Sequence, residues 1–210
     1  MKLLKNTLLA FPASLICSLC LIFLPNLAAS ANSDVKDEAK EPKLLVELPI
    51  IPKTFSVSIY RHELPGKSGA KRRAWSYVSH GFAALGQPEM VLTVPAREGE
   101  RDGDAPREPV KVLSFIYGAG EAEEEFTDGD YFTFPADFKP VAGQFKTCLF
   151  LLPQGDVNLP SAGKSKQMLA IVPVTEAEFE TYKLLGPGRV CRALALESGY
   201  FPFPTFCYRD

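Results

Sequence analysis

The first thirty or so residues decide how much of this chain is left to fold. Lys2 and Lys5 precede an apolar run, Leu8–Leu24, and the small residues Ala29 and Ala31 follow it. This order of positive, apolar and small residues is typical of a secretory signal peptide and predicts cleavage after Ala31. An uncleaved membrane anchor is the alternative, because a run of this length nearly spans a bilayer.

Cleavage would leave a mature chain of moderate size and mild negative charge. Of the 210 residues, 179 remain, which is enough for one domain with its own core. The lost segment holds two lysines and no acid, so 21 basic and 25 acidic residues give a net charge of −4. That charge is against nucleic acid as the main ligand, and no second apolar stretch is long enough to span a membrane. We expect a periplasmic or secreted protein with a flexible polar leader at 32–43 and one domain at 44–210.

Three cysteines stay in the mature chain: Cys148, Cys191 and Cys207. An odd number permits one internal disulfide at most. If one forms, we expect it to join Cys191 to Cys207, because the short aromatic tail could bring Cys207 back within reach. Three separate buried thiols are the alternative.

Alternation and turn residues predict a sheet with few helices. In Phe55–Tyr60 the apolar residues occupy every second position, the period of a half-buried strand. The clearest helix follows Thr175, which forms a capping-box pattern with Glu178, and it ends at Gly186. Val110–Tyr117 fits either a strand or a short buried helix. The predicted fold class is α+β: a single domain with a mixed or mostly antiparallel sheet. Further strands are expected at Leu44–Ile51, Tyr131–Phe134, Thr147–Leu152 and Met168–Val174, and loops at Arg61–Arg73 and Ala96–Pro109.

The segment Ala74–Pro95 predicts a strand, a turn with two glycines, and a second strand. We expect Gly81 and Gly86 to shape the turn, because glycine tolerates backbone angles that other residues resist. Gln87 and Glu89 are then expected to brace that turn by hydrogen bonds rather than to perform chemistry.

The sequence offers little for catalysis. His62 and His80 are the chain's two histidines, and neither has a partner at metal-ligand spacing. Two Gly-Lys-Ser triplets, at 66–68 and 163–165, lack the earlier glycine of a phosphate-binding loop. A hydrolase could still assemble from distant residues, such as Cys148 with His80. We expect no cofactor, no metal site and no enzyme activity.

Three segments, in order along the chain, resemble one family. Tyr77–Val91 resembles the signature of suppressor-of-fused-like domains. It is closer still to the C-terminal domain of the FYVE-finger adaptors, endofin and the Smad anchor for receptor activation. Leu169–Glu178 resembles the strand-to-helix step of bacterial suppressor-of-fused domains, and Tyr200–Phe206 is similar to the aromatic and proline-rich ending of the adaptors. The resemblance implies an α+β module that binds proteins and has no catalytic residues.

We therefore expect an exported, non-catalytic domain that binds a protein partner, with the partner and the oligomeric state left open. Two alternatives remain: an exported hydrolase with a dispersed site near His80, and a small-ligand or envelope-structural protein. A structural or partner-binding role is expected for Trp75, His80, Gly81, Gly86, Gln87, Glu89, Tyr200, Phe201, Phe203 and Phe206.

Overall fold

The computed structural model describes residues 42–65, 71–120, 125–138, 145–152 and 168–190. All of them belong to the unit Glu38–Asp210. The predicted signal peptide, the predicted Cys191–Cys207 pair and the four tail aromatics, Tyr200, Phe201, Phe203 and Phe206, lie outside the described residues.

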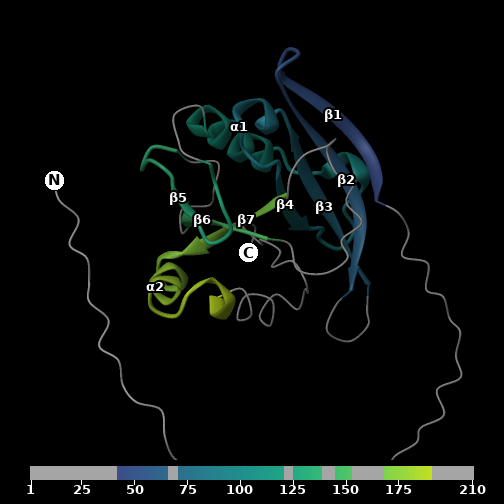
Figure 1. Cartoon of the computed structure of the whole chain (residues 1–210). Helices are drawn as coiled ribbons and strands as arrows, with labels where there is room; N and C mark the ends of the chain where they lie inside the picture. The colour runs from purple at the N-terminus through teal and green to yellow at the C-terminus, as the bar shows by residue number, and fades with distance from the viewer. Residues whose placement is uncertain (1–41, 66–70, 121–124, 139–144, 153–167, 191–210) are drawn as a thin grey trace, which may run out of the picture. The chain divides into compact units, whose positions relative to one another are not determined.

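Within these described residues, seven strands form one mixed sheet (Figure 1). Their order across the sheet is β1-β2-β3-β4-β7-β6-β5, and every neighbouring pair is antiparallel except β4 and β7. The predicted α+β class with a mixed sheet and few helices is confirmed. The strands are β1 (Lys43–Ile51), β2 (Phe55–Pro65), β3 (Lys71–His80), β4 (Met90–Pro95), β5 (Tyr131–Thr133), β6 (Phe145–Leu151) and β7 (Leu169–Thr175).

Among the described residues, α-helices cover both faces of the sheet. Figure 1 shows α1 (Glu108–Gly120) and α2 (Glu176–Leu185) on opposite sides. On the α1 face, Trp75 and Leu92 pack with Leu113 in the larger core cluster. On the other face, Val78 and Val91 belong to a second cluster, against which Phe179 and Tyr182 of α2 pack. Strand residues alternate between these faces because successive side chains point to opposite sides of a sheet.

The undecided segment Val110–Tyr117 is helical, within α1. Its buried residues follow helical spacing, with Val112, Leu113, Ile116 and Tyr117 all at or below 3% exposure. Pro109 stands in the first turn, where its missing N–H breaks no helical hydrogen bond.

The predicted capping box at the start of α2 is confirmed. The Thr175 hydroxyl oxygen accepts from the Glu178 N–H at 3.3 Å, and the Glu178 carboxylate accepts from the Thr175 N–H at 2.6 Å. Gly186 follows the helix with a φ of 79°, an angle that favours glycine.

Two predicted loops are wrong in extent. Within Arg61–Arg73, β2 continues to Pro65 and β3 begins at Lys71, with Glu63 opposite Arg73. Polar residues can pair across the solvated end of a two-stranded ribbon, so no apolar period marks these strands in the sequence. Ala96–Pro109 is also shorter than expected, because α1 already begins at Glu108.

Candidate functional site

The turn between β3 and β4 depends on two glycines, as predicted. Gly81 has a φ of 131° and Gly86 a φ of 77°, and a short 3₁₀ helix, Phe82–Leu85, lies between them. A Cβ atom on Gly81 would lie 2.3 Å from the Thr54 carbonyl oxygen, whereas nothing lies within 4 Å of one on Gly86. Position 81 therefore requires glycine for two reasons: its backbone angle is positive, and the β1–β2 turn leaves no room for a Cβ atom.

Glu89 closes this turn with its carboxylate. One oxygen accepts from the Ser79 hydroxyl at 2.6 Å, and the other accepts from the N–H groups of Gly81 and Ala83 at 2.8 and 3.2 Å. The Ser79 hydroxyl oxygen in turn accepts from the Met90 N–H at 2.7 Å. Glu89 is only 3% exposed, so a buried carboxylate ties the start of the turn to the end of β3. The prediction that Glu89 braces the turn is confirmed.

Gln87 joins the same turn to the chain that follows α1. Its side-chain oxygen accepts from the Phe126 N–H at 2.8 Å, and its amide donates to the Gly120 carbonyl at 3.5 Å. Gln87 is 5% exposed, and Trp75 is fully buried in the core beside α1. The structure thus places both of these residues in the interior rather than on a free surface.

Both histidines bond to serines on the face opposite α1. The His62 ring and the Ser76 hydroxyl are 2.8 Å apart, and Ser76 also bonds Thr93 at 2.6 Å. The His80 ring lies 2.7 Å from the Ser58 hydroxyl.

Cys148 lies on the other side of the sheet. It belongs to the core cluster on the α1 face. Burial raises the pKa of its thiol, and hydrogen bonds to the backbone of Phe132 and Cys148 lower the pKa by a smaller amount. The alternative pairing of Cys148 with His80 is therefore not formed, because the sheet separates the two side chains.

His62 should make the stability of the fold depend on pH. The residue is 8% exposed, and burial lowers its pKa from 6.5 to about 4. In the unfolded chain His62 binds a proton near pH 6.5, whereas in the folded chain it does so only near pH 4. The contribution of neutral His62 to stability is therefore full above pH 6.5 and declines as the pH falls from 6.5 to about 4. Urea unfolding should show a loss of about 2 kcal/mol between pH 7 and pH 5. In His62→Gln this component should vanish, and an unchanged pH profile in that variant would contradict the assignment.

Strand β1 forms one edge of the sheet and exposes apolar side chains. Leu45 and Leu48 pack toward the α1 core, but Leu44 is 49% exposed, Val46 40% and Ile51 44%. Its register with β2 shifts near both ends, which leaves a short regular stretch from Val46 to Pro49. Edge strands present unpaired backbone N–H and C=O groups, so an exposed apolar edge is suited to pairing with another chain.

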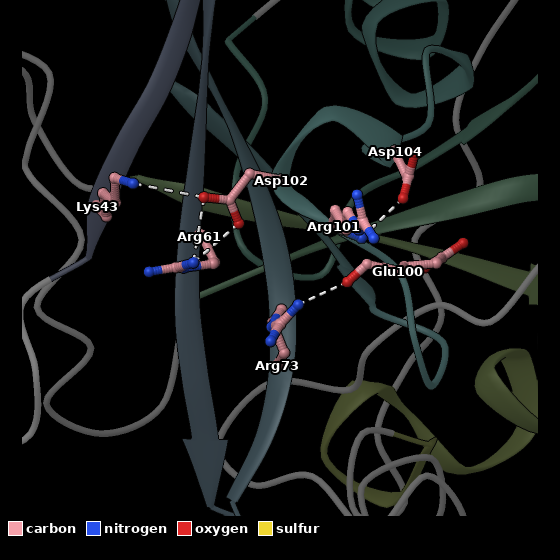
Figure 2. Close-up of polar contacts among 7 residues, drawn as sticks. All are labelled: Lys43, Arg61, Arg73, Glu100, Arg101, Asp102 and Asp104. Carbon is pink, nitrogen blue, oxygen red and sulfur yellow. Dashed lines mark hydrogen bonds and ion pairs between the residues drawn. The ribbon is translucent and has the colours of Figure 1, made fainter.

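The loop at residues 96–107 is bound to β2 and β3 through several polar contacts (Figure 2). At its start, the Arg73 guanidinium donates to the Glu100 carbonyl at 2.6 Å. At its end, the buried Tyr77 hydroxyl donates to the Pro106 carbonyl at 2.6 Å. Between these points the loop carries its own 3₁₀ turn, Asp102–Asp104. The loop is therefore held beside β1 by residues of the neighbouring strands.

Asp102 is the centre of the charged contacts in this loop. Figure 2 shows its carboxylate joined to Lys43 of β1 and to Arg61 of β2. The nitrogen-to-oxygen distances are 3.4 Å to Lys43 and 2.9 Å to Arg61. Desolvation opposes ionisation of this carboxyl, but the hydrogen bonds and charges of Arg61 and Lys43 outweigh it and lower the pKa. The ionised Asp102 thus ties the loop to both strands.

A cleft of about 420 Å³ lies between β1 and this loop, and we call it the β1 cleft. It is lined by Lys43–Val46 of β1, Ile59 of β2, and Asp102, Gly103, Ala105 and Arg107 of the loop.

Sequence reasoning did not find this surface. Its residues come from three segments, and the charged loop carries no motif that predicts where it folds back. Two further observations concern the described part of the chain alone: no helix there is long and apolar enough to cross a membrane, and no group of three metal-ligating side chains gathers there.

Comparison with protein-family models and with curated proteins gave no match. Among solved structures, the chain is similar to one from the Sufu–Fu complex, with 15% identity and a TM-score of 0.47, over 66% of this chain and 68% of that one. It is similar to Drosophila Suppressor of Fused, with 14% identity and a TM-score of 0.47, over 66% of this chain and 38% of that one. A putative suppressor of fused homolog from Neisseria gonorrhoeae shares 19% identity and a TM-score of 0.47, over 74% of each chain. These neighbours carry the broader family name given by the sequence resemblance, and the FYVE-finger adaptors are not among these three.

Proposed function

We propose that this chain is an exported, non-catalytic domain that binds a protein partner along β1. The observation that carries the proposal is the exposed apolar edge of the sheet. Four apolar residues of β1 are each at least 36% exposed: Leu44, Val46, Ile50 and Ile51. Within the described residues, this strand has a neighbour on one side only. A partner segment in extended conformation could add to this edge through main-chain hydrogen bonds and cover these side chains.

Binding at an edge strand needs both backbone groups and side-chain contacts. The regular stretch from Val46 to Pro49 is short, and Pro49 has no N–H to donate. Main-chain pairing alone would therefore be weak here, and the apolar side chains on either side of the stretch would supply the remaining contact area.

The contacts of the reactive side chains support a role without catalysis. His62 and His80 are bonded to Ser76 and Ser58 within the sheet. The Cys148 thiol is fully buried with a raised pKa, which disfavours the thiolate that a nucleophile needs. His62 and Cys148 thus belong to the interior of the fold, and His80 is a half-buried partner of Ser58 on the sheet.

Export rests on the order of charged, apolar and small residues before Asn32. The mature protein, recovered from outside the cytoplasm and sequenced from its N-terminus, should begin at Asn32. Recovery of a chain that retains Met1 would contradict cleavage.

The binding proposal is tested by capturing partners with the mature protein and with two matched variants. Val46→Asp places a charge on the β1 edge, and Leu184→Asp places the same charge on α2, where Leu184 is 81% exposed. A partner that binds at β1 should bind Val46→Asp at least about tenfold more weakly, a loss of about 1.4 kcal/mol, and should bind Leu184→Asp as it binds the unchanged protein.

The reverse result would move the binding surface to α2, where Leu185 is exposed beside Leu184 and where Tyr131 of β5, also exposed, contacts Phe179. Capture that neither substitution weakens would overturn the proposal for β1. Both variants should unfold at the same urea concentration as the parent, since both substitutions are at exposed positions.

A further inference from the structure

The β1 cleft combines apolar walls with an excess of positive charge. Ile59 and Ala105 supply apolar surface, while Lys43 and Arg107 line the same space. Its volume of about 420 Å³ lies within the range of about 300–1,000 Å³ that is common for ligand pockets.

Of the described residues that line the cleft, Asp102 alone carries a carboxylate, and it already pairs with Arg61 and Lys43. Arg61 contacts both of its oxygens, at 2.9 and 3.1 Å, and Lys43 contacts one of them at 3.4 Å. The Lys43 side chain is 60% exposed, so this longer contact leaves its ammonium group open to a second anion. Among the described residues, no hydrogen bond or ion pair engages the Arg107 side chain. The positive charges therefore outnumber the single negative charge of Asp102, since Lys43, Arg61 and Arg107 carry one each.

We propose that the β1 cleft binds an acidic side chain, Asp or Glu, carried by the extended peptide segment that pairs with β1. Arg107 and Lys43 bind the carboxylate, and Ile59 and Ala105 contact its aliphatic stem. This inference rests on the proposed function, and it names the chemistry of the partner at that surface.

The position of the cleft favours a peptide-borne carboxylate over a free one. Leu44 and Val46 both line the cleft and belong to the exposed apolar edge. A segment lying along β1 therefore has a side-chain pocket directly beside its backbone. An arginine guanidinium can hold a carboxylate through two parallel N–H donors, which fixes the position of the acid along the segment.

The probe for this proposal is a display library of random dodecapeptides selected on the mature protein. Selected peptides should share one Asp or Glu at a fixed position among apolar residues. In a synthesised winner, replacing that Glu by Gln or that Asp by Asn should weaken binding about tenfold or more. The preference for the acidic peptide over its amide counterpart should be lost in the Arg107→Gln variant. It should be kept in the matched control Arg189→Gln, which changes an exposed arginine outside the cleft.

The Asp102→Asn variant should change the affinity for the acidic peptide in the opposite direction. Removal of this carboxylate frees Lys43 and Arg61, so the acidic peptide should bind several-fold more tightly at low salt. A purely structural role for Asp102 would weaken binding instead. Unfolding midpoints of the variants show whether each one is folded.

The proposal is overturned if no peptide is selected, if the acid is not enriched, or if its preference survives Arg107→Gln. Glutarate is the control for a free small carboxylate. If glutarate displaces the peptide at a concentration equal to the peptide's own dissociation constant, the cleft is a small-carboxylate site and the proposal is overturned. Peptides that bind without an acid and fail on Val46→Asp would overturn this inference while leaving the proposed function intact.

Discussion

Replacing Gly81 with alanine should destabilise the domain by roughly 4 kcal/mol. Its φ of 131° is an angle that a residue with a Cβ atom adopts only under strain. The added carbon would also lie 2.3 Å from the Thr54 carbonyl oxygen, so the β1–β2 turn or the β3–β4 turn has to move. Urea unfolding of the Gly81→Ala variant would measure the loss, and failure to fold at all would agree with it.

Gly86→Ala is the matched control for this prediction. Gly86 also has a positive φ, 77°, but nothing lies within 4 Å of the Cβ position. Only the backbone angle is then penalised, and the expected loss is about 1 kcal/mol. Equal losses in the two variants would show that the close approach to Thr54 is unimportant and would contradict the geometry described here.

Replacing Glu89 with alanine should destabilise the domain by about 3 kcal/mol or more. The substitution removes the acceptor from three donors, namely the Ser79 hydroxyl and the N–H groups of Gly81 and Ala83. A donor left without a partner in the interior loses its hydrogen bond to water as well as the one to Glu89. Amide hydrogen exchange at Gly81 and Ala83 should accelerate in the variant, because their protecting bonds are gone.

Two further variants separate the brace from a general effect of charge. Glu89→Gln keeps one oxygen to accept from the two N–H groups and places an amide beside Ser79, so its loss should be about 1 kcal/mol. Glu98→Ala removes an exposed acid and should change the free energy of unfolding by less than about 0.5 kcal/mol. A loss in Glu89→Ala no larger than in Glu98→Ala would contradict the bracing role.

The features that could be predicted from the sequence depend on neighbours in the chain. The capping box of Thr175 and Glu178 lies within one helical turn. The turn held by Gly81 and Glu89 lies within nine residues, and glycines mark where its backbone angles are unusual. Local hydrogen bonds and backbone angles leave this kind of mark in a sequence.

The features that could not be predicted depend on partners far along the chain. The apolar segment inside α1 is buried against strands and a loop that its own sequence does not reveal, so its period alone did not separate helix from strand. The polar ends of β2 and β3 pair only because the ribbon continues beyond the core. The β1 cleft brings Lys43 to Asp102 and Arg107, and no spacing rule connects residues so far apart.

The parallel join between β4 and β7 has a consequence for the order in which this domain assembles. It consists of two register pairs, Met90 with Leu169 and Val91 with Ala170, whose members are about 80 residues apart in the chain. On either side of it, β1–β4 and β5–β7 are two sets of antiparallel neighbours joined through much shorter connections. Pairs that close short loops form sooner, because less chain entropy is lost. We therefore expect the two antiparallel parts to form early and the join between them to be the slow, committing step of folding.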